Sequence, residues 1–203
     1  MEMPSVTSEF NLYLLGGLLA GCGLLMALER LGLPTTLKLP IKGDIKRESR
    51  FIAQYGQFVC TILVAVLVLQ LDPDPHRRRQ IAVAVAGTYL ATTVSTLIKR
   101  LLGRVRPGRP DAGHFLGPSW RHDNQRESFP SNHSAAAVGL SVGLAIMYPQ
   151  AAVTFWTLAL CCAALRYLLD AHWPSDILGG IAVGYGIAHA TFFLAARMWP
   201  GWA

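Results

Sequence analysis

Two histidines, each at the start of an apolar segment, carry the residue types that nucleophilic and acid–base chemistry requires. His133 ends the motif PSNH, which opens one apolar segment. His172 lies in RYLLDAHWPSD, four residues before Asp176, and at this spacing a carboxylate can hold one nitrogen of the imidazole ring. The other nitrogen of His172 is then free to attack an electrophile, while His133 can protonate a leaving oxygen.

Basic residues flank both histidine motifs and predict that this chemistry is directed at an anion. A guanidinium group can grip phosphate oxygens through two parallel N–H bonds, and an ammonium group adds a point charge. Four basic residues are close enough in the sequence to serve: Lys99, Arg104, Arg106 and Arg166.

Both histidine motifs also resemble helix starts. Ser131 or Asn132 suits the N-cap of a helix that follows Pro130, and Pro174 suits the first turn of another. Helix N-termini present free backbone N–H groups and a positive dipole end, which together favour an anion. The sequence therefore predicts an anion site that contains two imidazoles.

The elements that must position these residues are apolar helices. Of the 203 residues, 52% are hydrophobic and 15% are charged, and the mean hydropathy is +0.37. A soluble domain has about 25% charged residues. The apolar residues form five uncharged runs: Asn11–Leu28, Phe51–Leu71, Gln80–Ile98, Ser134–Leu165 and Ile177–Ala196.

The first three runs are each long enough, at about 1.5 Å per residue, to cross a hydrocarbon core about 30 Å thick. The fourth is too long for one crossing, and the sequence MYPQ at 147–150 divides it. We therefore predict an all-α, polytopic membrane bundle in a single domain over residues 1–203, without a cleaved signal peptide. The six predicted spans are 10–29, 51–71, 80–98, 134–148, 151–166 and 176–198.

In an alternating bundle the ends of odd spans and the starts of even spans share one membrane face. The basic cluster at 99–107, the PSNH motif and the segment 166–176 all satisfy this rule, so they are predicted to meet on one face. Glycine pairs at four-residue spacing predict close helix packing, which would bring the histidine motifs together. These pairs are Gly17 with Gly21, Gly139 with Gly143, and Gly180 with Gly184.

The order and spacing of the motifs resemble the three signatures of the type 2 phosphatidic acid phosphatase (PAP2) superfamily. In this sequence they read Lys99-x6-Arg106-Pro107, Pro130-Ser131-Asn132-His133 and Arg166-x5-His172-x3-Asp176. The resemblance implies metal-independent hydrolysis of a phosphate ester or pyrophosphate through a phosphohistidine, with no cofactor.

By this resemblance His172 is the nucleophile, Asp176 orients it, and His133 is the acid for the leaving group and then the base for water. The phosphate cradle would comprise Lys99, Arg106, Ser131 and Arg166, and Asn132 is predicted to bind phosphate beside Ser131. The sequence departs from the family pattern at two positions. Asn132 stands where glycine is usual, although its amide can still donate to phosphate, and Leu165 stands where a serine usually precedes the arginine.

Three other interpretations stay open at this point. The chain could pass the phosphoryl group to an acceptor other than water, act as a lipid A phosphatase of the same superfamily, or serve as a non-catalytic transporter or scaffold. Transporters place charges in mid-span, whereas here the charges lie at span ends. A metal site formed by His133, His172 and Asp176 would be opposed by the surrounding cations, and activity that survives a chelator would exclude it.

A site at the ends of membrane helices favours a phosphorylated lipid as substrate, such as a polyprenyl diphosphate, phosphatidic acid or phosphatidylglycerol phosphate. The net charge of +6 is explained by membrane anions and this substrate, without nucleic acid. The oligomeric state stays open.

The expected location is the bacterial inner membrane with the site on the periplasmic face. The positive-inside rule argues the other way, because all Lys and Arg residues except Arg77, Arg78, Arg79 and Arg197 lie on the site's face.

Residues outside the motifs are assigned structural roles. The four cysteines lie within apolar spans and are predicted to be packing residues. His189 is predicted to be a hydrogen-bonded residue of the bundle interior, and His76 is expected on the face opposite the site.

Overall fold

The computed structural model describes residues 10–33, 35–37 and 43–199, and these residues form helices and loops without a strand. Lys38 and Lys42, two of the basic residues predicted on the site's face, lie outside the described residues. Two short 3-10 turns, η2 (Gln54–Gly56) and η3 (Pro149–Ala151), interrupt the helical order. The α-helices are α1 (Leu12–Arg30), α2 (Gly43–Ala53), α3 (Phe58–Leu71), α4 (Pro75–Leu102), α5 (Asn132–Met147), α6 (Ala152–Leu168) and α7 (Pro174–Met198).

The helix ends follow local capping chemistry. The Asp74 side chain accepts from the backbone N–H of His76, and Pro75 fills the first turn of α4. The same helix stops at Gly103, whose φ of 62° is left-handed. Asn11 caps α1 in the way Asp74 caps α4. The α5 and α7 starts are capped by site residues, as described below.

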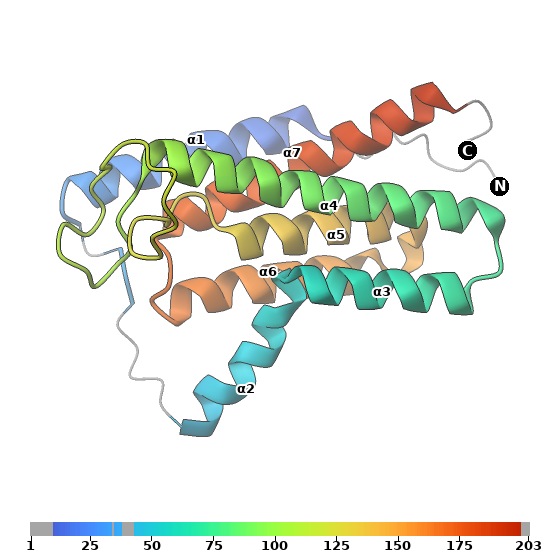
Figure 1. The fold of residues 1–203 in the computed structure, drawn as a ribbon, viewed down its shortest axis with the longest axis horizontal. Coiled ribbons are helices and arrows are strands. Elements are labelled where there is room, and N and C mark those ends of the chain that lie inside the picture. The colour runs from blue at the N-terminus through green and yellow to red at the C-terminus, as the bar shows by residue number, and fades with distance from the viewer. Residues whose placement is uncertain (1–9, 34, 38–42, 200–203) are drawn as a thin grey trace.

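Helix α5 is the centre of the bundle. It packs against α4, α6 and α7, while α1 packs on α7 and α3 packs on α4. Figure 1 shows these helices running side by side, with the long loop between α4 and α5 covering one end. Nearly every residue of α5 is buried, whereas Cys22 is the only buried residue of α1. The core is therefore built around the helix that carries PSNH.

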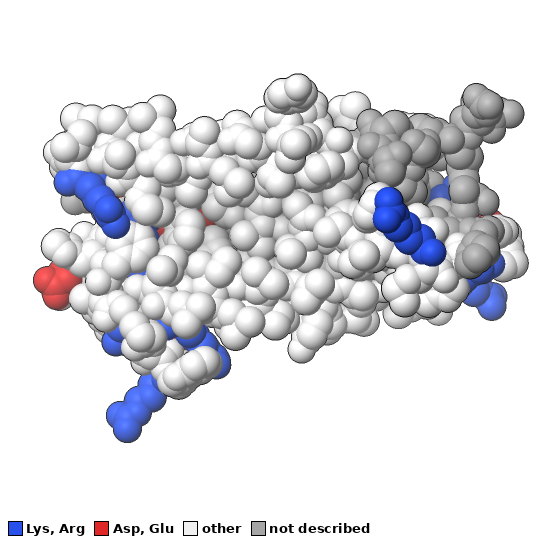
Figure 2. Space-filling model, turned by 90° about the horizontal axis from the view of Figure 1, so that it is seen from above, with Lys and Arg blue, Asp and Glu red and all other residues white. Residues whose placement is uncertain are grey.

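Within the described residues, four helices are long and apolar enough to cross a membrane: α1, α4, α6 together with η3, and α7. The bent pair α2–α3 makes a fifth candidate when it is counted as one span. Helix α5 is apolar but has 16 residues, about 24 Å at 1.5 Å per residue. Lys, Arg, Asp and Glu gather toward the two ends of the molecule on the face in Figure 2, and an uncharged band separates them.

The predicted uninterrupted span 51–71 is wrong. The chain leaves α2 at Ala53, passes through η2 and enters α3 at Phe58 with a bend of 66°. The cause is a tertiary contact, because a Cβ atom at Gly56 would overlap the carbonyl oxygen of His133 and meet the Sγ atom of Cys162. The other predicted spans are helical, although α4 extends beyond 80–98 at both ends.

The glycine pairs differ in outcome. A Cβ atom at Gly180 or Gly184 would overlap a carbonyl oxygen of α5 or its cap, and one at Gly143 would lie 2.5 Å from the Cβ atom of Ala84 on α4. These close approaches confirm the predicted packing of α4, α5 and α7. The outcome for Gly17 and Gly21 is divided: a Cβ atom at Gly17 would meet nothing outside its own helix backbone within 4 Å, whereas one at Gly21 would lie 3.3 Å from Cδ1 of Leu178 on α7.

Candidate active site

The three polar clusters meet at one end of the bundle, as the span parity predicts. Lys99, in the last turn of α4, donates to the carbonyl oxygens of Glu127 (2.8 Å) and Ser128 (3.3 Å) in the loop before α5. Arg106 donates to the carbonyl oxygen of Ala171 at 3.0 Å. The backbone N–H of Ser131 donates to the carbonyl oxygen of Asp176 at 2.9 Å, which joins the starts of α5 and α7.

Asp176 is fixed from several directions at the start of α7. Its Oδ2 atom accepts from the backbone N–H of Trp173 at 2.9 Å and from the Ser128 hydroxyl. Its Oδ1 atom accepts from Nη1 of Arg104 at 2.7 Å. The carboxylate is fully buried, so these donors hold an anion that water does not reach. This rigid carboxylate is a suitable orienting partner for an imidazole.

His172 lies against this carboxylate. Its Nδ1 atom is 3.5 Å from Oδ2 of Asp176, too far for a well-formed hydrogen bond, and Nδ1 has no hydrogen-bond partner. Burial lowers the pKa of His172 from 6.5 to about 3; Asp176 opposes this shift, and the charges of Lys99 and Arg106 reinforce it. The ring is therefore neutral near pH 7, which is the form in which imidazole is a nucleophile.

His133 occupies the first turn of α5 and is partly buried. Arg166, Lys99 and Arg106 are close enough to act on its charge. Lys99 and Arg106 also act on His172, so the two histidines share the same cations. The contact between Gly56 and the His133 carbonyl supports this turn from the side of η2.

The cations of the predicted cradle have unused donors. Lys99 is 4% exposed and donates to backbone carbonyls, so no carboxylate offsets its charge directly. The Nε atoms of Arg106 and Arg166 are buried without a hydrogen-bond partner. Burial lowers the pKa of Arg106, as expected for a cation that is out of water.

Ser131 and Asn132 are engaged within the bundle. Ser131 is the N-cap of α5, and its Oγ atom accepts from the Ser134 hydroxyl at 3.0 Å. Asn132 donates from Nδ2 to Oγ1 of Thr96 on α4 at 3.0 Å, and its Oδ1 atom has no partner. Contact of either side chain with phosphate therefore stays a prediction.

Three further polar residues complete the site and were missed in the sequence analysis: Glu29, Ser128 and Ser175. Arg104, which the sequence placed among the phosphate-binding cations, instead donates to Glu29 and Asp176, both at 2.7 Å. The parity rule contained a signal for Glu29, because this carboxylate ends the first predicted span on the site's face. Nothing in the sequence indicated its partner, which lies 75 residues away.

Residues outside the motifs follow their predicted roles with one qualification. His189 is buried, and its Nδ1 atom lies 2.9 Å from the Tyr185 carbonyl oxygen. His76 lies in the first turn of α4, at the end of the helix opposite Lys99. All four cysteines are free, but only Cys22 and Cys162 are buried. Among the described residues, no group of three or more His, Cys, Asp or Glu side chains is arranged to hold a metal ion.

Comparison with known proteins identifies relatives over the part of the chain that carries the site. "Lipid A 1-phosphatase" of Rhizobium etli is 34% identical over 118 residues, which are 55% of this chain and 51% of that protein. "Decaprenylphosphoryl-5-phosphoribose phosphatase" of Mycobacterium tuberculosis is 40% identical over 102 residues, 49% of this chain and 52% of that protein. The chain thus spans about half the length of these curated relatives. No solved structure matches it.

The family comparison covers more of the chain. Residues 80–199 match the PAP2 superfamily, and this range contains α4, α5, α6 and α7 with all three motifs. The structure brings these motifs together at one end of the bundle. The chain belongs to the PAP2 superfamily.

Proposed function

We propose that this chain is an integral-membrane lipid phosphatase that hydrolyses a phosphate ester or pyrophosphate through a phosphohistidine on His172. The observation that carries the proposal is a neutral, buried imidazole, His172, that lies 3.5 Å from the fixed carboxylate of Asp176 and is close enough to Lys99 and Arg106 for their charges to act on it. Membership in the PAP2 superfamily and relatives that are named phosphatases support the same reaction class.

In the first step the phosphate group enters the cradle of Lys99, Arg106 and Arg166, whose unused donors it satisfies. The Nε2 atom of His172 then attacks phosphorus with its lone pair, and the bond from phosphorus to the lipid oxygen breaks. His133 gives its proton to that oxygen, because the phosphate anion favours the protonated imidazole. Asp176 stabilises the positive charge that forms on His172, and binding of substrate is expected to shorten the 3.5 Å contact.

In the second step His133, now neutral, takes a proton from water. The hydroxide oxygen bonds to phosphorus as the bond between phosphorus and Nε2 breaks, and the electron pair returns to His172. Inorganic phosphate leaves, and both histidines return to their starting protonation states. The cations hold the charge of the phosphoryl oxygens in both steps, so the chemistry needs no metal ion.

The substrate is a lipid whose tail stays in the bilayer while its phosphate reaches the helix ends. We propose six crossings, formed by α1, the bent α2–α3 pair, α4, α5, α6 and α7, in one domain over residues 1–203. The site lies on one membrane face, for which we propose the periplasmic face of a bacterial inner membrane. Candidate lipids are a polyprenyl diphosphate, phosphatidic acid, phosphatidylglycerol phosphate and, because of the first relative's name, lipid A.

Release of inorganic phosphate by the purified protein from a panel of these lipids tests the proposal. We expect release that a chelator does not reduce, with one lipid preferred, and none from His172→Ala. Transfer of the phosphoryl group to an added acceptor lipid without release would identify a phosphotransferase. Release that is lost with the chelator and restored by a metal ion would contradict the mechanism, and no turnover of any phosphorylated lipid would contradict the function.

A further inference from the structure

Glu29, the second-last residue of α1, is held inside the site although most residues of α1 are exposed or half-buried. Its Oε1 atom accepts from the backbone N–H of Ser175 at 3.1 Å, and its Oε2 atom accepts from the Ser175 hydroxyl at 2.5 Å and from Nη2 of Arg104 at 2.7 Å. The side chain is 2% exposed. Cys22, the one residue of α1 whose backbone and side chain are both buried, also donates to the Ser175 carbonyl at 3.3 Å. Helix α1 thus meets α7 at the residue that precedes Asp176.

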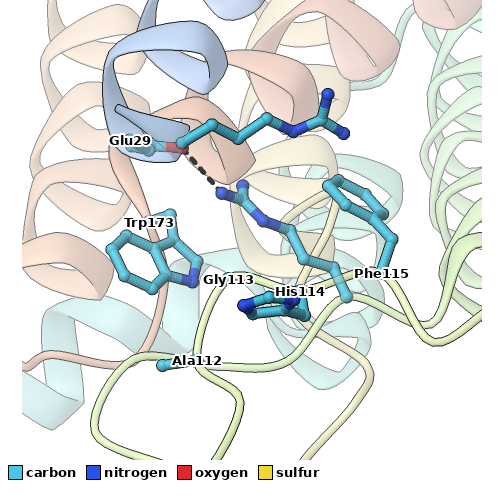
Figure 3. A pocket seen from close by; sticks show the side chains of 8 residues that line it. Glu29, Ala112, Gly113, His114, Phe115 and Trp173 are labelled. Carbon is cyan, nitrogen blue, oxygen red and sulfur yellow. Dashed lines mark hydrogen bonds and ion pairs between the residues drawn. The ribbon is translucent and has the colours of Figure 1, made fainter. Parts of the chain in front are cut away.

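Arg104 joins Glu29 to Asp176. Its Nη1 atom donates to Oδ1 of Asp176 at 2.7 Å and to the Ser175 hydroxyl at 2.6 Å, while Nη2 donates to Glu29. The guanidinium carbon lies 5.4 Å from the centroid of Phe115 and 5.3 Å from that of Trp173. Figure 3 shows the ion pair to Glu29 beside these rings, at the wall of a cavity of about 410 Å³. The side chains of Glu29, Arg104 and Asp176 are at most 2% exposed, so their charges act on one another with little screening.

Glu29, Arg104 and Asp176 together carry a net negative charge, because two carboxylates flank one guanidinium. When His172 bonds to phosphorus, its ring becomes positive, and the charge on Asp176 must stabilise it. Arg104 offsets part of the Asp176 charge. Glu29, on the other side of the guanidinium, offsets part of the Arg104 charge in turn. The negative charge of Asp176 therefore stabilises a positive His172 ring more than it would beside Arg104 alone.

We infer that Glu29 is a positioning residue for the reaction. Through Arg104 it orients Asp176 and strengthens the effect of the Asp176 charge on His172, although it does not touch the substrate. The inference rests on the proposed function, because it assigns the first helix a role in the same phosphoryl transfer. By the same inference, the Arg104–Asp176 ion pair takes part in the reaction in addition to anchoring the loop after α4. A residue that acts on the positive ring of His172 should affect the transition state more than the binding of substrate or product.

The variant Glu29→Gln tests this inference, because glutamine keeps the shape and removes the charge. We expect kcat to fall about tenfold or more, a loss of the size seen when a residue that orients a metal ligand is removed, with KM within about twofold of the wild type. Affinity for orthovanadate, which forms a five-coordinate adduct like the transition state, should fall by the same factor. Inhibition by inorganic phosphate should stay unchanged. The matched control is Glu48→Gln on α2, whose side chain is 63% exposed, and it should behave as the wild type.

A kcat and a vanadate affinity of Glu29→Gln within about twofold of the wild type would overturn the inference, as would equal losses in vanadate and phosphate affinity. If Glu29→Gln does not fold, Arg104→Lys takes its place, since one ammonium keeps the charge but cannot bridge both carboxylates as the two Nη atoms do. The same selective loss is expected, and unchanged kcat and vanadate affinity would overturn the inference.

A wild type that binds vanadate but turns over no lipid would contradict the proposed function alone, and the vanadate measurement would still decide the role of Glu29. A wild type that does not bind vanadate would overturn both.

Discussion

At the scale of single residues, the candidate site combines a neutral imidazole, the proposed nucleophile, with charges that are already fixed. Burial keeps His172 uncharged, and Asp176 waits beside it with its remaining lone pairs occupied by Ser128, Trp173 and Arg104. Because these donors are in place before the reaction, little reorganisation is needed when charge develops on the ring. Such a site has a disadvantage, because protonation of His172 destabilises the folded protein.

The pH dependence of stability should show this cost. The pKa of His172 is about 3 in the folded protein and 6.5 when the ring is free, so the unfolded chain binds the proton first as pH falls. The folded state should therefore lose stability as pH falls from about 6.5 towards 3, by about 1 kcal/mol per pH unit, and nothing from this group above 6.5. Chemical unfolding in detergent measures the slope. His172→Gln should reduce it, and His76→Gln, at an exposed position, should not; equal slopes in wild type and His172→Gln would refute the assignment.

Residue types and spacing were sufficient to predict which side chains gather, but not which pairs form. The four-residue spacing of His172 and Asp176 and the parity of the clusters led to the observed placement. The pairing of Arg104 with Glu29 could not be predicted from the sequence, because it depends on how α1 packs against α7. The turn of Asn132 toward Thr96 was missed for the same reason, since it depends on the approach of α4.

At the scale of elements, the site is assembled by the close packing of α5 on α7. Gly180 lies against the Ser131 carbonyl and Gly184 against the Ala135 carbonyl, so the two helix starts approach within hydrogen-bonding distance. The hydrogen bond from Ser131 to the Asp176 carbonyl is the direct result. Small side chains on α7 therefore set the distance between the two histidine motifs.

Gly184→Ala should disturb this distance. The added Cβ atom would overlap backbone atoms of Ala135, so α5 must move away from α7 and carry His133 with it. We expect a lower melting temperature and a loss of about tenfold or more in kcat/KM, measured on the folded fraction. Gly17→Ala, where the new methyl group meets no atom within 4 Å, is the control and should be neutral. Wild-type activity in Gly184→Ala would show that the approach of the helices is not needed.

The bend between α2 and α3 marks the limit of prediction from apolar runs. Residues 51–71 are uncharged and gave no sign of a break. The turn at η2 forms because Gly56 fits against the first turn of α5, and Tyr55 bonds to Ser141 at 2.8 Å. A composition window responds to hydrophobicity and length, so it does not register a contact made with a helix 77 residues further on.

At the scale of the whole molecule, charge and apolar surface are divided along the bundle. Figure 2 shows the uncharged band between two charged ends, as expected for a protein that spans a bilayer. The loop between α4 and α5 closes the end that holds the site, and the turn before α4 lies at the opposite end (Figure 1). All-helical architecture and the meeting of the three motifs were predicted from the sequence, whereas the number of crossings rests on how α5 and the α2–α3 pair are counted.

Cysteine labelling at the two ends tests the alternation of spans and the membrane face. In a variant without the four native cysteines, Ser119→Cys and His76→Cys are exposed to a membrane-impermeant maleimide in intact cells and after lysis. We expect the two positions to label from opposite sides, with Ser119→Cys accessible in intact cells. Labelling of both from one side would contradict the odd number of crossings between them, and labelling of His76→Cys alone would place the site in the cytoplasm.

The most direct test of the mechanism is to find the phosphoryl group on the enzyme. Protein mixed with a ³²P-phosphorylated lipid is quenched in alkali, which preserves phosphohistidine, and the labelled peptide is identified by mass spectrometry. We predict label on the peptide that contains His172, lost on treatment with acid and absent in His172→Ala. Release of phosphate by the wild type with no label on His172 under these conditions, or label on another residue, would contradict the account.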